Sequence, residues 1–225
     1  MKLYYHPLSA TSRPILQFCA NAGITYEAVV IDLMTGEHFK EPYASLNPNC
    51  MVPAIDDDGF VLTESSAILK YLAEKYQSST YPSDLKQRAR VNEMIDWFNA
   101  NLYREYGYHL IYPQILPHHA RQPEEANKAT IEWGQTETRK MLQTLNDHYL
   151  GQNHNYLCGD TITLADYFGA ALMTLGEIIG NDFSDYANIE SWLKTIKAMP
   201  SWSTVNEIHN DFAASMKEKT FMTLV

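Results

Sequence analysis

Four small or hydroxyl-bearing residues, Ser9-Ala10-Thr11-Ser12, separate an aromatic, strand-like segment from a predicted helix that begins near Arg13-Pro14. Serine and threonine are ordinary helix caps, because their side-chain oxygens accept free N–H groups of the first turn. Thr11 and Ser12 fit that role best. The same hydroxyls are also donors at the positive end of a helix, where an anion is stabilised. No strong base lies near Ser9 in the sequence, which argues against a serine nucleophile of the hydrolase kind.

A second polar pair, Glu64-Ser65, stands where a predicted strand ends and a helix begins. The Ser65 hydroxyl and the free N–H groups of the first helical turn form a suitable seat for a carboxylate. The Glu64 carboxylate suits an ammonium group, so the two residues together fit an amino-acid zwitterion. A plain helix cap is the alternative.

The elements that position these residues follow a βαβ–ββα order in the first 80 residues. The first helix has an apolar stripe, and Gly23 stands at its expected C-cap. Asp57-Asp58-Gly59 is a hairpin signal between the last two strands. This order predicts a mixed α/β sheet with helices on both faces. The predicted strands are Lys2–Tyr5, Tyr26–Ile31, Pro53–Asp56 and Phe60–Thr63.

The second half of the chain shows only helical periodicity. Residues 81–84 are a predicted linker, and residues 85–225 are predicted to form an all-α helical bundle. Apolar residues recur at helical spacing in 86–104, 124–149, 163–179 and 189–196. Thr163 and Asp166 have the spacing of a capping box, which indicates a role in folding.

The composition excludes several classes of function. A net charge of −10 and the lack of any basic run argue against nucleic acid. The apolar stretch 168–179 is too short to cross a bilayer, and three cysteines do not make a disulfide framework. The histidines lack metal-ligand spacing, so we expect no metal. Residues 1–5 enter a strand directly and leave no room for a signal peptide, so we expect a cytoplasmic protein with no membrane partner.

Three motifs together carry a resemblance that spans essentially the full chain. They are YYHPLSATSRP at the start, LNPNCMVPAIDDDGFVLTESSAILKYLAEKY at residues 46–76, and GDTITLADYF at residues 159–168. The sequence resembles the glutathione transferases, and its start resembles the serine-type theta and delta classes. The resemblance implies a thioredoxin-like, glutathione-binding domain at residues 1–80 and a helical, electrophile-binding domain at 85–225. It also implies an enzyme that activates the glutathione thiol as a thiolate.

The resemblance assigns roles to individual residues. Ser9 takes the place of the first cysteine of a thioredoxin-like CxxC, and it would donate to the glutathione sulfur, with Thr11 as the rival donor. Val52 would pair with the cysteinyl backbone beside a cis Pro53. The remaining glutathione-binding candidates are Glu64 and Ser65 at the γ-glutamyl end, His38 at the glycyl carboxylate, and Cys50 close to the tripeptide.

Three positions depart from the family pattern. Delta-class sequences usually have histidine at Cys50 and arginine at Ser66, and theta-class sequences have a lysine near Met51. The loss of these cations is expected to weaken the hold on the carboxylates of glutathione. Cys50 is either a free thiol near the tripeptide or a buried, inert residue.

The sequence defines the binding site for the electrophile less clearly than the glutathione site. Tyr103, Tyr106 and Tyr112 are candidates for the wall of a hydrophobic electrophile pocket, although their helical spacing suits the core equally well. The tail KTFMTLV is a candidate cover for that pocket. The family implies a homodimer with glutathione as co-substrate and no prosthetic group. A glutathione-dependent dehalogenase of small halocarbons and a non-enzymatic binding module are the alternatives.

Overall fold

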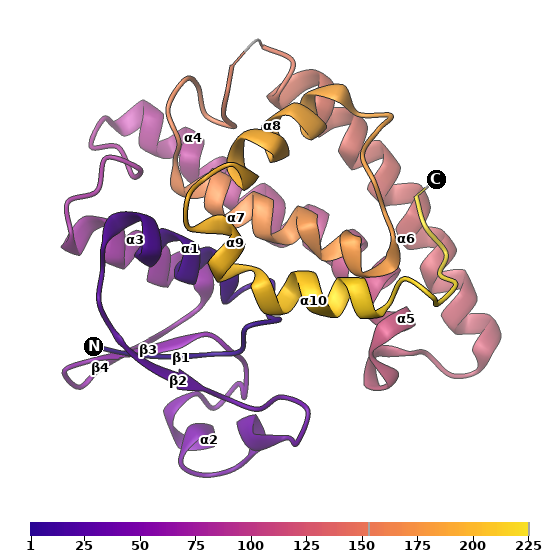
Figure 1. The fold of residues 1–225 in the computed structure, drawn as a ribbon, viewed down its shortest axis with the longest axis horizontal. Helices are drawn as coiled ribbons and strands as arrows, with labels where there is room; N and C mark the ends of the chain where they lie inside the picture. Colours follow the sequence, from indigo (N-terminus) through magenta and orange to yellow (C-terminus); the bar gives the residue numbers. More distant parts are fainter. Residues whose placement is uncertain (153, 225) are drawn as a thin grey trace.

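The N-terminal half is built on a four-stranded sheet, seen at the lower left of Figure 1. The computed structural model describes residues 1–152 and 154–224. Its sheet has the order β2-β1-β3-β4, with β1 parallel to β2 and both other pairs antiparallel. This confirms the predicted mixed sheet. The strands are β1 (Lys2–Tyr5), β2 (Glu27–Val30), β3 (Ala54–Asp57) and β4 (Phe60–Thr63).

The register of β1 and β3 brings the segment that contains Ser9 close to the Val52–Pro53 segment. Tyr4 pairs with Ala54 in an antiparallel arrangement, so the end of β1 lies beside the start of β3. The segment after β1 contains Ser9, and the residues before Ala54 are Val52 and Pro53. The Val52–Pro53 peptide bond is cis, as the family resemblance implied.

Helices cover both faces of the sheet. Leu3 and Ile55 point toward α1 (Arg13–Ala22) and α3 (Ser65–Lys75), where they join the main apolar core. On the other face Ala54 joins a small cluster with Tyr43 of α2 (Tyr43–Leu46). A short 3-10 helix, η1 (Glu37–Phe39), precedes α2. As predicted, α1 ends at Gly23, whose φ of 65° lies in the left-handed region that glycine adopts without steric cost.

The second half is helical, in agreement with the periodicity. α7 is its centre, because all ten residues of this helix are buried. Three of the four predicted helical stretches change helical type along their length, with π-helical turns at η2, η3 and η5 and a 3-10 turn at η6, whereas the stretch 189–196 lies within the uninterrupted α8. The elements are α4 (Leu85–Asp96), η2 (Trp97–Leu102), η3 (Arg104–Ile111), α5 (Tyr112–Ile115), η4 (Pro117–His119), α6 (Glu124–Thr144), η5 (Leu145–Tyr149), α7 (Leu164–Met173), η6 (Thr174–Ile179), α8 (Ala187–Lys197), α9 (Trp202–Val205) and α10 (Glu207–Ser215).

The capping box predicted from the sequence is present at the start of α7. The Asp166 carboxylate accepts the backbone N–H of Thr163 at 2.8 Å and that of Leu157 at 2.9 Å. It also accepts the indole N–H of Trp192 from α8 at 2.9 Å. Asp166 is fully buried, so these bonds compensate the loss of its hydration and link three segments. Asp166 therefore has a structural role and stabilises the fold.

Arg13, the first residue of α1, joins the two halves of the molecule. Its guanidinium is 1% exposed and donates to Thr174 Oγ1 at 3.0 Å, Asn206 Oδ1 at 2.8 Å and the Ala171 carbonyl at 2.7 Å. The start of α1 is therefore fixed against the C-terminal end of α7. Within residues 1–152 and 154–224, no helix combines the length and the apolar composition needed to cross a membrane.

Candidate active site

A chain of hydrogen bonds connects the loop before α1 to the cis-proline segment. The Thr11 hydroxyl donates to the Val52 carbonyl at 3.1 Å, and Thr11 Oγ1 lies 2.9 Å from Ser9 Oγ. Thr11 has a single hydroxyl proton, which the bond to Val52 uses. Ser9 is therefore the donor in its bond with Thr11.

Ser9 also accepts a hydrogen bond from the start of α1. The backbone N–H of Ser12 donates to Ser9 Oγ at 3.1 Å. Ser12 Oγ is buried with no partner among the described residues, and no first-turn N–H donates to the Thr11 side chain there. Ser12 stands at the N-cap position of α1, one of the two residues expected there, but its side chain makes no capping bond. The Ser9 hydroxyl instead accepts the N–H of Ser12, because the chain turns tightly after β1.

The strand-to-helix junction at Glu64 has an unusual backbone. Glu64 has φ 68° and ψ 115°, a sparsely populated combination for a residue with a side chain. Its side chain is exposed, whereas Ser65 is 7% exposed at the first position of α3. Among the described residues the Ser65 hydroxyl has no hydrogen-bond partner, so this group is available beside the free N–H groups of the helix. Such a junction can receive a carboxylate.

The residues before Val52 are braced by the helix on the other face of the sheet. The Met51 carbonyl accepts Tyr43 Oη at 2.5 Å and Asn47 Nδ2 at 2.7 Å. Cys50 is half-buried and has a φ of 52°. The side chain of Met51 is 55% exposed. These bonds hold the backbone that leads to Val52 and Pro53 in one conformation.

His38 lies on η1, with its ring centroid 3.9 Å from that of Phe39. Its Nδ1 atom is buried and has no partner among the described residues. Burial and, after it, the charge of His118 lower the pKa of His38. His118 belongs to η4 in the helical half.

Three tyrosines form one cluster in the helical half. Tyr103 Oη lies 2.6 Å from Tyr112 Oη, and the ring of Tyr108 packs 5.1 Å from Tyr103 and 5.2 Å from Tyr112. Tyr103 and Tyr108 are five residues apart, and a π-helical turn places such a pair on the same face, which an α-helix does not. Sequence reasoning missed Tyr108 for this reason, since α-helical periodicity points it away from Tyr103.

Tyr106, the other tyrosine expected in the pocket wall, has a different position. It is 1% exposed, and its hydroxyl donates to the Met173 carbonyl of α7 at 3.2 Å. A side chain so enclosed packs against α7 and leaves no open face for a substrate. The structure therefore places Tyr106 in the core, the alternative that its helical spacing had left open.

The C-terminal tail is fixed against the helical half and runs along α6 (Figure 1). The Gln114 side chain exchanges two hydrogen bonds with the Met222 backbone, at 3.0 and 2.8 Å. Arg139 of α6 donates to the Leu224 carbonyl at 3.0 Å. This anchoring directs the tail away from the sheet half. Val225, the last residue of the tail, lies outside the described residues.

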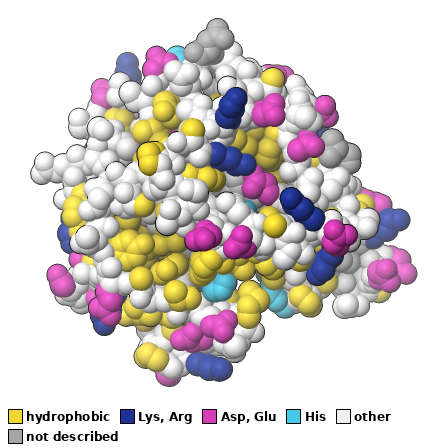
Figure 2. Space-filling model, in the orientation of Figure 1, with side chains coloured by type: hydrophobic (Ala, Val, Ile, Leu, Met, Phe, Trp, Pro, Cys, Tyr) yellow, Lys and Arg dark blue, Asp and Glu magenta, His cyan; other side chains and the backbone are white. Residues whose placement is uncertain are grey.

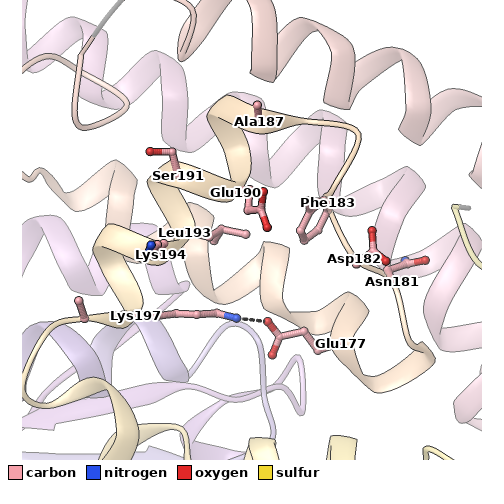
Figure 3. A pocket seen from close by; sticks show the side chains of 11 residues that line it. Glu177, Asn181, Asp182, Phe183, Ala187, Glu190, Ser191, Leu193, Lys194 and Lys197 are labelled. Atoms are coloured by element: carbon pink, nitrogen blue, oxygen red, sulfur yellow. Dashed lines mark hydrogen bonds and ion pairs between the residues drawn. The ribbon is translucent and has the colours of Figure 1, made fainter.

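A separate hollow of about 900 Å³ lies between η6 and α8 (Figure 3). Phe183 and Leu193 contribute apolar surface to it, and an ion pair between Lys197 and Glu177 lies at one side. All of its lining residues belong to the helical half. It is therefore distinct from the loop that contains Ser9.

Comparisons with known proteins agree with this arrangement. The model of the glutathione S-transferase N-terminal domain matches residues 1–74, and that of the C-terminal domain matches residues 111–200. The chain is 31% identical to rat (Rattus norvegicus) glutathione S-transferase theta-2 over 234 residues, which cover 100% of this chain and 91% of the relative.

Two solved structures are similar over nearly the whole chain. Human glutathione transferase theta-2, in complex with glutathione and an unknown ligand, has a TM-score of 0.86 and 30% identity, covering 98% of this chain and 92% of that one. A delta-class glutathione transferase from Nilaparvata lugens has a TM-score of 0.79 and 32% identity, covering 96% and 98%. A sheet domain and a helical domain that both match define a class of two-domain transferases. The chain belongs to the glutathione S-transferase family.

Proposed function

We propose that this glutathione transferase activates the glutathione thiol as a thiolate through the hydroxyl of Ser9, for attack on a hydrophobic electrophile. The observation that carries the proposal is the position of Ser9 Oγ, which accepts the Ser12 N–H at the start of α1 and donates its own proton to Thr11. A hydroxyl polarised in this way turns from Thr11 to a sulfur anion with little rearrangement.

The hydrogen bonds and the helix dipole at this site can supply the free energy needed to lower the thiol pKa of glutathione. A free thiol with a pKa of about 8.5 is only a few per cent ionised at pH 7. Lowering the pKa by about two units requires about 2.7 kcal/mol of preference for the anion. A hydrogen bond to a charged group contributes about 1.5–3 kcal/mol. The N-terminus of α1 adds a favourable dipole.

The remaining glutathione contacts follow from the same site. Ser65 and the first N–H groups of α3 bind the γ-glutamyl carboxylate, and the exposed Glu64 binds the ammonium group. The backbone of Val52 beside Pro53 pairs with the cysteinyl residue, with Cys50 nearby. His38 binds the glycyl carboxylate. Because Cys50, Met51 and Ser66 are uncharged, the affinity for glutathione is lower than in the delta and theta classes.

The cluster of Tyr103, Tyr108 and Tyr112 forms one wall of the electrophile pocket. Burial raises the pKa of all three phenols, so they are neutral at physiological pH. Their rings offer apolar contact to a hydrophobic electrophile, and a neutral hydroxyl donates to an acceptor atom that the electrophile carries. The proposed division into residues 1–80, linker 81–84 and residues 85–225 agrees with the interval between the end of α3 at Lys75 and the start of α4 at Leu85. We expect a cytoplasmic homodimer, as the family implies.

The experiment begins with retention on immobilised glutathione. Retained protein is then assayed with chlorodinitrobenzene, an organic peroxide and a dihalomethane, and its mass is measured by light scattering at micromolar concentration. Conjugation of at least one electrophile is expected. A protein that binds glutathione but leaves its thiol pKa at the solution value would contradict the proposal and would favour a binding module.

A further inference from the structure

The C-terminal tail, residues 221–224, has neither helical nor strand structure, and side chains of other elements bind its main chain. Gln114 of α5 donates to the Met222 carbonyl at 3.0 Å and accepts the Met222 N–H at 2.8 Å. After the end of η6, Asn181 Oδ1 accepts the N–H of Leu224 at 2.8 Å. These bonds are made to the peptide backbone, so they fix the place of the tail independently of its side chains.

α6 contributes to the same binding. Gln135 donates to the Thr223 carbonyl, and Arg139 Nε donates to the Leu224 carbonyl at 3.0 Å. The two donors are four residues apart and therefore lie on one face of the helix. The Leu224 side chain is 8% exposed and joins the main apolar core. The tail is thus held along α6 by polar bonds together with one apolar anchor.

The connection between α10 and the tail is a separate, exposed segment. Residues 217–220 are all exposed, and their sequence is Lys-Glu-Lys-Thr. Figure 2 shows Lys, Arg, Asp and Glu side chains gathered near the end of α10, where this connection begins. A segment with so few buried contacts does not hold its neighbours in place. The position of the tail therefore depends on the side chains that bind its backbone.

Gln114 connects the tail to the tyrosine cluster. Its Nε2 also donates to the Leu110 carbonyl of η3 at 2.8 Å. Tyr112 stands two residues before Gln114 in the four-residue helix α5, and its Oη lies 2.6 Å from Tyr103 Oη. A helix of four residues has almost no stability of its own. The place of α5 therefore depends on its contacts, among them the bonds from Gln114 to the tail.

We propose that Gln114 is a positioning residue for the electrophile. Bound to the Met222 backbone, it holds α5 in place and thereby keeps Tyr112 against Tyr103 in the wall of the pocket. The tail acts on that wall through Gln114 and needs no contact with the electrophile. This inference rests on the proposed function, in which the tyrosine cluster is one wall of the electrophile pocket, and it assigns a role to a contact outside the glutathione site.

Two ligands separate the electrophile pocket from the glutathione site. S-methylglutathione occupies the glutathione site, whereas S-(2,4-dinitrophenyl)glutathione also places an aromatic group against the tyrosine cluster. Calorimetry compares the intact protein with Gln114→Met, which keeps the side-chain length without its polar atoms, and with a chain that ends at Thr220. We expect the affinity for the dinitrophenyl conjugate to fall about fivefold in both variants, the size of one hydrogen bond. The affinity for S-methylglutathione should change little.

Gln87→Met is the matched control, since Gln87 is an exposed glutamine on α4, and it should bind both ligands as the intact protein does. A combined variant tests whether Gln114 and the tail act through one contact. Gln114→Met in the chain that ends at Thr220 should lose no more affinity for the dinitrophenyl conjugate than either change alone, because the second change removes a contact already lost.

Unchanged affinity for the dinitrophenyl conjugate in both variants would overturn the role of Gln114. Equal losses for the two ligands, or additive losses in the combined variant, would overturn it as well, since they indicate a general loss of structure. In each case the proposed function still stands if S-methylglutathione binds the intact protein and Ser9→Ala raises the thiol pKa of bound glutathione. If the intact protein binds neither ligand, the proposed function is wrong and the role of Gln114 falls with it.

Discussion

The Thr11 hydroxyl donates to the Val52 carbonyl oxygen at 3.1 Å, although the two residues are 41 positions apart in the chain. This bond joins the loop before α1 to the segment before β3. It also uses the only proton of Thr11, so the oxygen of Thr11 is left to accept from Ser9. Thr11 thereby holds the Ser9 hydroxyl in place in the empty site without having to touch the sulfur.

Thr11→Val should remove this bridge and keep the side-chain shape. We expect the free energy of unfolding to fall by about 1 kcal/mol, the contribution of one hydrogen bond. The thiol pKa of bound glutathione should change far less than in Ser9→Ala, because the donor to the sulfur remains. Urea denaturation and titration of the thiolate absorbance measure the two quantities. Thr11→Ser, which retains the hydroxyl, should restore the lost stability.

Ser65→Ala separates binding from thiol activation. The variant should weaken glutathione binding by about 1–2 kcal/mol through the lost hydrogen bond to the γ-glutamyl carboxylate. The thiol pKa should stay nearly unchanged, since Ser65 lies at the other end of the tripeptide. Calorimetry gives the affinity, and Ser66→Ala is the neighbouring control. Unchanged affinity in Ser65→Ala would mean that the γ-glutamyl seat lies elsewhere. Ser66→Arg should tighten binding by adding the missing cation.

Arg13→Met tests the contact between the two halves. It leaves Asn206 Oδ1 and the Ala171 carbonyl buried without the donor they have now. An unsatisfied buried group costs about 1–3 kcal/mol, so we expect a loss of several kcal/mol in the free energy of unfolding. Arg13→Lys retains the charge and one donor nitrogen in place of the guanidinium fork, so it should lose less. Equal losses in denaturant titrations of the two variants would contradict a role for the guanidinium geometry.

His209 gives the fold a predictable acid sensitivity. Burial and the charge of Arg13 lower its pKa to about 3, and its Nε2 donates to the Thr174 carbonyl at 3.0 Å. An unfolded histidine has a pKa of about 6.5, so below that pH the unfolded chain binds the extra proton. Stability is therefore complete above about pH 7 and falls with decreasing pH, by up to about 1.4 kcal/mol per pH unit between 6.5 and 3.

His209→Gln removes this titration and can still donate to Thr174. Urea denaturation between pH 6.5 and 5 should show a slope smaller by about one proton than that of the intact protein. His148→Gln serves as the exposed control and should keep the original slope. Equal slopes in the intact protein and His209→Gln would show that His209 is not the responsible group.

The sequence predicted those parts of the fold that depend on neighbouring residues. Strands β1 and β4 begin and end at the predicted residues, Gly23 ends α1, and Thr163 with Asp166 forms the capping box. Each of these features is decided by residues within a few positions of one another. The resemblance to a family supplied the rest of the architecture, including the cis bond before Pro53.

Features that depend on tertiary contacts were missed. Ser9 accepts the N–H of Ser12 because of the tight turn after β1, whereas cap preference alone pointed to Thr11 or Ser12. Tyr108 joins the tyrosine cluster through a π-helical turn, which periodicity of 3.6 residues does not reveal.

Ser9→Ala is the most direct test of thiol activation. The thiol pKa of bound glutathione should rise by about one to two units, since the lost bond to the thiolate is worth about 1.5–3 kcal/mol. Conjugation at neutral pH should fall about ten- to a hundredfold and partly recover as the pH rises, while glutathione affinity changes little. Ser12→Ala, which removes a hydroxyl without a partner among the described residues, is the matched control and should leave the pKa unchanged. An unchanged thiol pKa in Ser9→Ala would contradict the account; a rise in Thr11→Val instead would make Thr11 the donor.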